Sequence, residues 1–179
     1  MKWDEEDRHT LLATIEDFEE YLSSPQLNWV LPGYSTTLTL GSILLSLKRL
    51  SSCKSQTLPS DVQQAISKIE ETKGKRTSIW ERKIEAEFPY RIRLWENIIS
   101  DYYEEGRLDQ AYSAQVRNRV ILDLLSKERR LFDLKQDDKI TDLDLRLRKL
   151  TGIGSFVWDP VLEAVFDPEK FWYLYVRTG

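Results

Sequence analysis

Residues 77–106, TSIWERKIEAEFPYRIRLWENIISDYYEEG, decide the fold class of this chain. Their apolar side chains recur at intervals of three and four residues, which places them on one face of an α-helix. Ser78 followed by Glu81 is a capping-box pattern at its start, and Gly106 predicts its end. Pro89 has no amide to donate and its ring clashes with the preceding turn, so we expect a kink or a restart near Phe88. The expected buried positions are Trp80, Ile84, Phe88, Ile92, Trp95, Ile99 and Tyr102.

Three more helices are expected on the N-terminal side of this stretch. The first begins near Asp4 and ends at Ser23-Ser24-Pro25. The second starts among residues 36–39, where Gly41 allows a neighbouring element to approach closely. The third follows the capping-box pattern of Ser60 and Gln63. Their apolar stripes are Leu11, Ile15, Phe18 and Leu22; Leu40, Ile43, Leu44, Leu47 and Leu50; and Val62, Ile66 and Ile69.

Two helices are expected on the C-terminal side. One runs from Asp109 or Ser113 to Phe132, and a shorter one covers residues 140–150. Residues 142–148 also alternate between leucine and polar residues, which is the period of a strand. We favour the helix because leucine, aspartate and arginine are poor strand formers. The residues expected to be buried are Val116, Val120, Leu124 and Leu131, then Ile140, Leu143, Leu147 and Leu150.

The chain as a whole is expected to form one all-α domain over residues 1–179, a bundle of about five or six helices around the kinked long helix. Its 179 residues are 41% hydrophobic and 31% charged, which is typical of a soluble globular domain. Seven glycines and six prolines are few, which favours long helices over many turns.

Residues 154–179 form an aromatic C-terminal segment with two alternative structures. Asp159-Pro160 and Asp167-Pro168 each place a capping residue before a proline, which predicts two short helices. A turn at residues 167–170 could instead join 161–166 and 171–177 as a hairpin. The helices are favoured, and both alternatives remain open. The aromatic residues concerned are Phe156, Trp158, Phe166, Phe171, Trp172, Tyr173 and Tyr175.

This segment is also the first candidate for a partner-binding site. A dense apolar run is either packed against its own helices or presented to a partner protein, and a homodimer could exchange it between two copies. A hairpin ending in Arg177 would add an edge strand that another chain could extend. The candidate partner-binding residues are Phe171, Trp172, Tyr173, Tyr175 and Arg177.

Basic residues provide a second candidate, a groove for nucleic acid between the helix of Trp80 and the helix of Val116. Residues 73–93 hold seven lysines and arginines against three glutamates. The net charge of −4 opposes the approach of a polyanion. The residues assigned to the groove are Lys75, Arg76, Arg82, Lys83 and Arg117, within a wider set that includes Lys73, Arg119, Lys127, Arg129 and Arg130.

Enzymatic and cofactor chemistry has little support in this sequence. His9 and Cys53 are each the single residue of their type, which argues against zinc sites, di-iron sites and disulfide frameworks. Gly74-Lys75 lacks the glycine and hydroxyl residue of a phosphate-binding loop, which predicts a basic turn between helices. The carboxylates of Asp101 and Glu105 share a helix face and give a third hypothesis, a small-ligand or metal-dependent enzyme. We expect no cofactor.

The expected location is the cytoplasm, with no membrane association. The acidic start at residues 4–7 is unlike a secretory signal. The longest apolar run, residues 171–176, is far shorter than the ~20 residues that cross a bilayer. The sequence therefore favours a non-enzymatic protein-interaction or structural protein, with nucleic-acid binding as the alternative.

Overall fold

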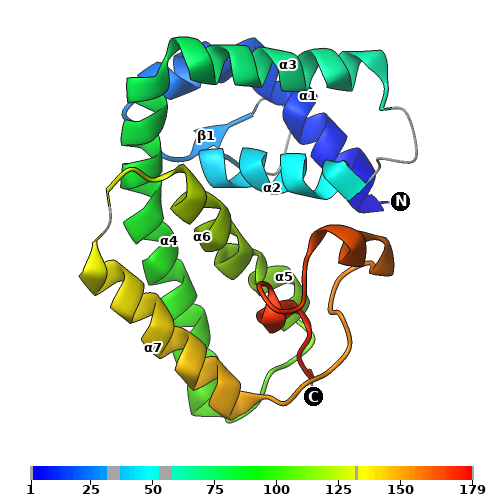
Figure 1. Cartoon of the computed structure of the whole chain (residues 1–179), viewed down its shortest axis with the longest axis vertical. Helices are drawn as coiled ribbons and strands as arrows, with labels where there is room; N and C mark the ends of the chain where they lie inside the picture. The colour runs from blue at the N-terminus through cyan, green and yellow to red at the C-terminus, as the bar shows by residue number, and fades with distance from the viewer. Residues whose placement is uncertain (1, 32–36, 53–57, 132, 179) are drawn as a thin grey trace.

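Helix α4 runs along most of the molecule, and the other long helices pack against it (Figure 1). The computed structural model describes residues 2–31, 37–52, 58–131 and 133–178. In chain order the elements are α1 (Lys2–Ser23), β1 (Trp29–Val30), β2 (Thr37–Leu38), α2 (Leu40–Leu50), α3 (Ser60–Lys75), α4 (Thr77–Glu105), α5 (Tyr112–Gln115), α6 (Arg117–Glu128), α7 (Leu134–Leu150) and the 3-10 helices η2 (Pro160–Val165) and η3 (Trp172–Leu174). Strands β1 and β2 form one short antiparallel pair, with Trp29 opposite Leu38. The fold is all-α, as the sequence predicted.

Helix α4 confirms the pattern that predicted it. All seven apolar positions of its three-and-four repeat are buried. The helix continues through Pro89, so the chain does not restart near Phe88. Pro89 has no amide, and the carbonyl of Glu85 therefore loses the helical hydrogen bond that residue 89 would otherwise donate. Packing of the buried face on both sides of Pro89 keeps the helix continuous.

The sharp turn in this part of the chain lies at Arg76, between α3 and α4. Arg76 has φ −122° and ψ 36°, and α4 begins at Thr77, one residue before the predicted cap Ser78. Ser60 is likewise the first residue of α3, and no side chain caps that helix. The two capping-box patterns were therefore wrong about the cap residue, although both lie within a residue of a true helix start.

The start of α2 combines a side-chain cap with a close contact between helices. The hydroxyl of Thr39 accepts a hydrogen bond from the Ser42 amide, and the Ser42 hydroxyl accepts one from the Thr39 amide. A Cβ atom added at Gly41 would lie 2.4 Å from Cγ2 of Ile121 and 2.6 Å from Oε1 of Glu87. The predicted close approach at Gly41 is confirmed, and the neighbours are α6 and α4.

The C-terminal helices differ from the expectation in their boundaries. The expected helix ending at Phe132 is divided at Val116 into α5 and α6, and Phe132 lies outside the described residues, as does Cys53. Leu131 was predicted to be buried but is 68% exposed, because α6 ends at Glu128 and leaves Leu131 beyond the helix face. Residues 140–150 are helical, as favoured, and α7 begins earlier, at Leu134.

The C-terminal segment, residues 151–178 and called the tail below, contains two short 3-10 helices. The carboxylate of Asp159 accepts a hydrogen bond from the Val161 amide at 3.0 Å and caps η2, as the Asp-Pro pattern predicted. The second Asp-Pro pair forms a turn, and η3 follows it at residues 172–174. The alternative hairpin of 161–166 with 171–177 is not formed. Ile153 instead pairs with Val176 in an antiparallel bridge.

Gly154 allows the two ends of the tail to touch. Its amide donates to the carbonyl of Tyr175 at 3.0 Å. A Cβ atom at this position would lie 2.4 Å from the backbone carbon of Val176 and 2.5 Å from the amide nitrogen of Arg177. Because both neighbours are backbone atoms, no change of rotamer can make room for a side chain.

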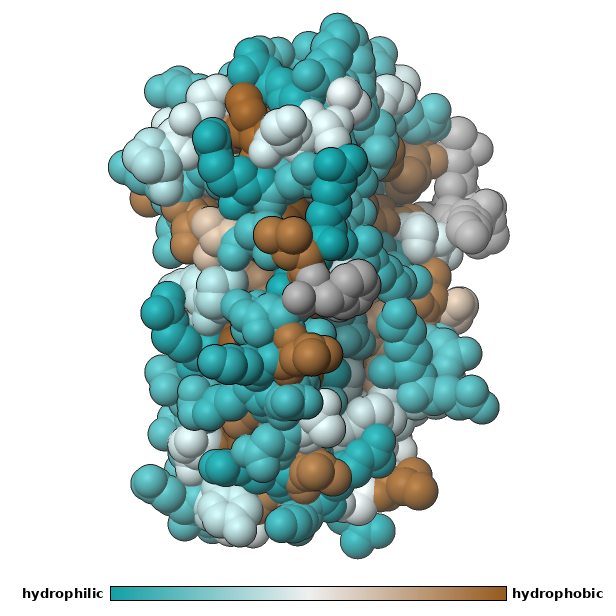
Figure 2. All heavy atoms as spheres, turned by 60° about the vertical axis from the view of Figure 1, so that its left-hand side comes forward, coloured by the Kyte–Doolittle hydropathy of each residue, from teal (hydrophilic) through white to brown (hydrophobic). Residues whose placement is uncertain are grey.

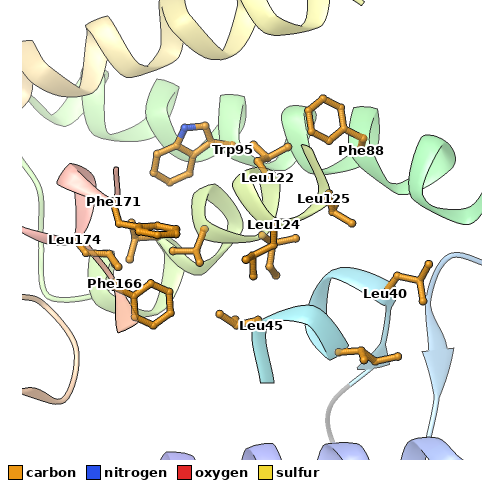
Figure 3. Close-up of a cluster of buried hydrophobic side chains, with 14 of the residues drawn as sticks. Leu40, Leu45, Phe88, Trp95, Leu122, Leu124, Leu125, Phe166, Phe171 and Leu174 are labelled. Atoms are coloured by element: carbon orange, nitrogen blue, oxygen red, sulfur yellow. The ribbon is translucent and has the colours of Figure 1, made fainter. Parts of the chain in front are cut away.

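The core extends from α2 through α6 to the tail. In Figure 3, Leu122, Leu124 and Leu125 of α6 lie between Phe88 and Trp95 of α4 on one side and Leu40 and Leu45 of α2 on the other, while Phe166, Phe171 and Leu174 of the tail close one end. The face shown in Figure 2 is mainly hydrophilic, with separate apolar spots. None of the described helices is long and apolar enough to cross a membrane.

Candidate functional site

Three lysines from distant parts of the chain lie near one another, and two of them, Lys48 and Lys170, lie over core aromatic rings. Lys48 lies near the end of α2, Lys127 lies in the last turn of α6, and Lys170 lies in the turn before η3. The ammonium nitrogen of Lys48 is 5.7 Å from the ring centre of Phe166 and 5.9 Å from that of Phe171. The ammonium nitrogen of Lys170 is also 5.9 Å from the ring centre of Phe171. We refer to Lys48, Lys127 and Lys170 as the lysine cluster.

The rings beneath the lysine cluster belong to the core. Phe166 and Phe171 are buried, and their ring centres are 5.1 Å apart at nearly right angles. Figure 3 shows both rings at the end of the core that the tail closes. The ring faces attract the lysine ammonium groups through the cation–π interaction. The cluster therefore rests on a fixed surface and not on a mobile loop.

Positive charge is concentrated at Lys127. Partial burial lowers the pKa of its ammonium group, and the charge of Lys170, direct side-chain contact with Lys170 and the charge of Lys48 lower it further. The carboxylate of Asp123, one helical turn earlier on α6, opposes this effect. Repulsion between like charges thus adds to burial in lowering the Lys127 pKa, against the attraction of Asp123.

Asp123 is already engaged by other partners. One of its oxygens accepts a hydrogen bond from Nη1 of Arg119 at 2.6 Å, and the other accepts one from the hydroxyl of Tyr173 at 2.8 Å. Arg119 also donates from Nε and Nη2 to the two oxygens of Asp144 on α7, both at 2.8 Å. Asp123 therefore serves mainly to hold α6 to the tail. Within the described residues, Lys127 and Lys170 form no ion pair.

The predicted partner-binding residues lie mostly inside the structure. Phe171 and Tyr173 are buried, and Trp172 and Tyr175 are half-buried. Arg177 is exposed. The tail thus packs on its own bundle, where the hydroxyl of Tyr112 donates to the carbonyl of Tyr173 at 2.8 Å. The guanidinium of Arg148 lies 3.6 Å from the ring centre of Trp172.

The predicted nucleic-acid groove is not brought together as one surface. Lys75 pairs with Glu71 of the same helix, and Arg76 pairs with Glu19 of α1 at 2.9 Å. Lys83 is buried, donates to the carbonyl of Ser24 at 2.9 Å and to that of Gln26, and has a pKa lowered by burial. Arg82 is exposed.

Arg117 lies apart from the rest of that basic set. Helices α4 and α6 are antiparallel, because Trp80 of α4 bonds Glu128 while Arg91 of α4 bonds Asn118. Arg117 is therefore level with Arg91, about 22 Å along α4 from Arg76 at 1.5 Å per residue. Its pKa is lowered by burial and by the charge of Arg91.

Two other candidate sites contain fewer grouped ionisable side chains. Asp101 and Glu105 are both exposed near the end of α4, and within the described part of the chain no three His, Cys, Asp or Glu residues are grouped to hold a metal ion. A groove of about 600 Å³ lies between residues 153–157 and 176–178, beside Gln110 and Ser113. Of the described residues that line this groove, Arg177 alone has an ionisable side chain. Neither place brings together three side chains of like charge from separate elements, as the lysine cluster does.

Sequence reasoning named Lys127 only within a wide basic set and did not single out Lys48 or Lys170. No local pattern links the three, because they belong to separate elements that only the packing of α2, α6 and the tail brings together. Comparison of the chain with protein-family models, with curated proteins and with solved structures finds no match. The function is therefore inferred from the residues themselves.

Proposed function

We propose that this protein is a non-enzymatic, cytoplasmic interaction protein that binds an acidic segment of a partner protein at the lysine cluster. The observation that carries the proposal is the gathering of Lys48, Lys127 and Lys170 from three elements, with Lys48 and Lys170 lying near the buried ring of Phe171. An acidic partner segment would place negative charge beside the exposed ammonium groups of Lys127 and Lys170.

The burial of the tail supports this choice of surface over the aromatic residues themselves. Phe171 and Tyr173 are sealed in the core, so exposing them to a partner would require the tail to unfold. The ammonium groups above them are reachable, because Lys127 and Lys170 are exposed. The aromatic tail then acts indirectly, by fixing the position of the lysines.

The experiment measures binding of a fluorescein-labelled ten-residue glutamate peptide by fluorescence anisotropy. The test variant carries Lys48→Glu, Lys127→Glu and Lys170→Glu. Its expected affinity is lower by about tenfold or more, because charge complementarity at the surface is reversed. Circular dichroism of each variant verifies that the helices are retained.

A matched control carries Arg93→Glu, Lys135→Glu and Lys149→Glu. These residues are exposed, and in the described structure none of them forms an ion pair. The control changes the net charge by the same amount and should keep most of the affinity. Equal losses in the two variants would mean a nonspecific attraction and would overturn the proposal.

Nucleic acid is the competing partner, and the same assay separates it. A ten-nucleotide single-stranded RNA is titrated in parallel at 50 and 200 mM salt. Tighter binding of RNA than of peptide, with an affinity that falls steeply with salt, would replace the protein partner with nucleic acid. Arg82→Glu is the informative variant for that outcome, because Arg82 is exposed while Lys83 is buried and bonded.

A further inference from the structure

We infer that residues 152–155 form a free strand edge that binds an extended segment of a partner protein, one in which acidic and β-branched residues alternate. We refer to residues 152–155 as the free edge. It contains no residue of the lysine cluster, so the inference goes beyond the proposed function and does not depend on it. The evidence is the direction of the backbone groups, the exposure of Ile153 and the position of Arg177.

The backbone groups of Ile153 point away from the rest of the tail. Ile153 lies opposite Val176, and the amides of Gly154 and Arg177 donate across the two segments on either side of this pair, both at 3.0 Å. In this antiparallel arrangement the amide and carbonyl of each paired residue point outward. Among the described residues, the amide and carbonyl of Ile153 accordingly form no hydrogen bond.

This edge is open to a further strand. Ile153 is 92% exposed, whereas its pair Val176 is buried. In Figure 1 the chain between α7 and η2 lies at the outer edge of the view. Sheet edges are usually protected by charged residues or proline, and the free edge, Gly-Ile-Gly-Ser, contains neither. A strand added here would cover Ile153 and bond to its amide and carbonyl.

Ile153 specifies one half of the ligand. The side chains of two directly opposite residues lie on the same face of an antiparallel pair, so the partner residue opposite Ile153 would pack against its side chain. A β-branched residue suits this position because such residues pack well on a pleated surface. The two neighbours of that residue would point to the other face.

Arg177 specifies the other half of the ligand. It lies across from Gly152, and its side chain is on the face opposite to that of Ile153, because side chains alternate along a strand. Arg177 is exposed and forms no ion pair with the residues that the structure describes. A Cβ atom added at Gly152 would meet nothing within 4 Å, so this face is open. Acidic residues on either side of the β-branched residue would therefore lie on the face of Arg177.

Charge also favours a partner protein over a second copy of this chain. The free edge has no charged residue of its own. Two copies paired through Ile153 about a two-fold axis would bring two Arg177 side chains to the junction and no carboxylate from the paired segments. A strand with alternating acidic residues instead places carboxylates beside Arg177.

The test uses a fluorescein-labelled peptide of alternating glutamate and valine, seven residues long, and measures its binding to the full-length protein by fluorescence anisotropy. Methylation of the valine amides removes the donors that face Ile153 and should weaken binding by about tenfold. Methylation of the glutamate amides is the matched control. It leaves those donors free and should change the affinity little.

Two protein variants test the position of the site. Ile153→Asp removes the apolar contact and opposes the acidic peptide, and Arg177→Glu reverses the charge. Each should weaken binding by about tenfold. The matched controls are Leu134→Asp, at an apolar residue that is 78% exposed in α7, and Arg93→Glu, at an exposed arginine of α4. Both controls should keep most of the affinity, and circular dichroism verifies that all four variants retain their helices.

Four outcomes would overturn the inference. The first is no binding of the unmodified peptide, and the second is equal binding of the two methylated peptides. The third is an affinity that Ile153→Asp and Leu134→Asp change equally. If the peptide is lost only in the triple variant Lys48→Glu, Lys127→Glu and Lys170→Glu, it binds at the lysine cluster, which leaves the proposed function in place.

Sedimentation velocity tests the remaining occupant, a second copy. The protein should sediment without a dimer that depends on the free edge. A dimer that Ile153→Asp dissociates and Leu134→Asp preserves would identify a second copy as the occupant and would overturn the partner strand.

Discussion

Two buried arginines, Arg91 and Arg119, link neighbouring helices through different sets of partners. Arg91 of α4 donates to Glu87 at 2.9 Å, to Thr39 at 2.8 Å and to Asn118 at 2.9 Å. Among the residues that the structure describes, Glu87 is the one carboxylate that forms an ion pair with Arg91. The second oxygen of Glu87 accepts a hydrogen bond from the Gly41 amide at 3.0 Å. This network ties α4 to the start of α2.

Arg119 of α6 instead has two charged partners, and both lie nearer the surface. The side chains of Asp123 and Asp144 are 19% and 18% exposed, whereas that of Glu87 is 1% exposed. This network ties α6 to α7 and to the tail. From this difference we expect Arg91 to depend strongly on its one counter-ion, whereas Arg119 should tolerate the loss of either of its two.

The largest expected effect comes from breaking the first network. Glu87→Ala leaves the guanidinium of Arg91 buried without a counter-charge and should lower the free energy of unfolding by about 3–5 kcal/mol. Asp144→Ala leaves Arg119 paired with Asp123 and should cost about half as much. Urea denaturation measures both. Equal losses would contradict the difference between the networks.

A smaller effect is expected at the glycine that donates to Glu87. Gly41→Ala places a methyl group against Ile121 and Glu87 and should lower the free energy of unfolding by about 1–3 kcal/mol, because the site is already filled. Gly74→Ala is the matched control in α3, where an added Cβ meets nothing within 4 Å. It should stabilise the helix by about 0.5–1 kcal/mol. A stabilising Gly41→Ala, measured by thermal unfolding, would refute the close packing.

Alkaline pH should weaken the second network more than the first. Burial raises the pKa of Tyr112 and Tyr173, and the charges of Asp144 and Asp123 raise them further. Burial, with the charge of Glu87, also raises the pKa of Tyr21 beside the first network. Above pH ~10 the unfolded chain releases these protons first, so stability present below pH 10 is lost as the pH rises toward the folded pKa values.

The expected loss is at most about 1.4 kcal/mol per pH unit for each tyrosine. Urea denaturation at pH 8, 10 and 11 measures it. Tyr112→Phe with Tyr173→Phe should flatten the pH dependence of the free energy of unfolding more than Tyr21→Phe, because the double variant removes two titrating hydroxyl groups and the single variant removes one. The same slope in all variants would show that these tyrosines do not carry the effect.

The smallest effect concerns the attachment of the tail. Tyr173→Phe removes the hydrogen bond to Asp123 and should lower the free energy of unfolding by about 1–2 kcal/mol. The control Tyr175→Phe removes a bond to the carbonyl of Phe166 within the tail. It should cost less, because Tyr175 is half-buried and its acceptor is a neutral carbonyl, whereas Tyr173 is buried and its acceptor is a carboxylate. A larger loss for Tyr175→Phe would place the anchor of the tail elsewhere.

The helices could be predicted from the sequence where one face repeats over several turns. The stripe of α4 and the close approach at Gly41 were both readable from local residues. Helix caps were harder to predict from the sequence. The capping pair of Thr39 and Ser42 has a serine where the usual pattern has glutamate or glutamine. Leu131 looked buried by spacing alone, since nothing local shows that α6 ends at Glu128.

The lysine cluster could not be predicted for a different reason. Lys48, Lys127 and Lys170 have no shared spacing, and their convergence depends on how the tail folds across α2 and α6. The tail itself was ambiguous, because Asp-Pro pairs suit both a helix start and a turn. Local chemistry therefore predicted the elements, while the site depends on tertiary packing between them.

The backbone contact at Gly154 gives a way to identify descendants of the same ancestral gene. Any side chain at this position would collide with the main chain of residues 176 and 177, so selection for this closure should preserve glycine there in every homologue. Aromatic residues two and four positions later, as at Phe156 and Trp158, pack within the same closure. The spacing Gly-x-aromatic-x-Trp, followed by Tyr173 in η3 and Tyr175 just after it, is a signature by which diverged homologues could be traced even after the surface lysines have been replaced.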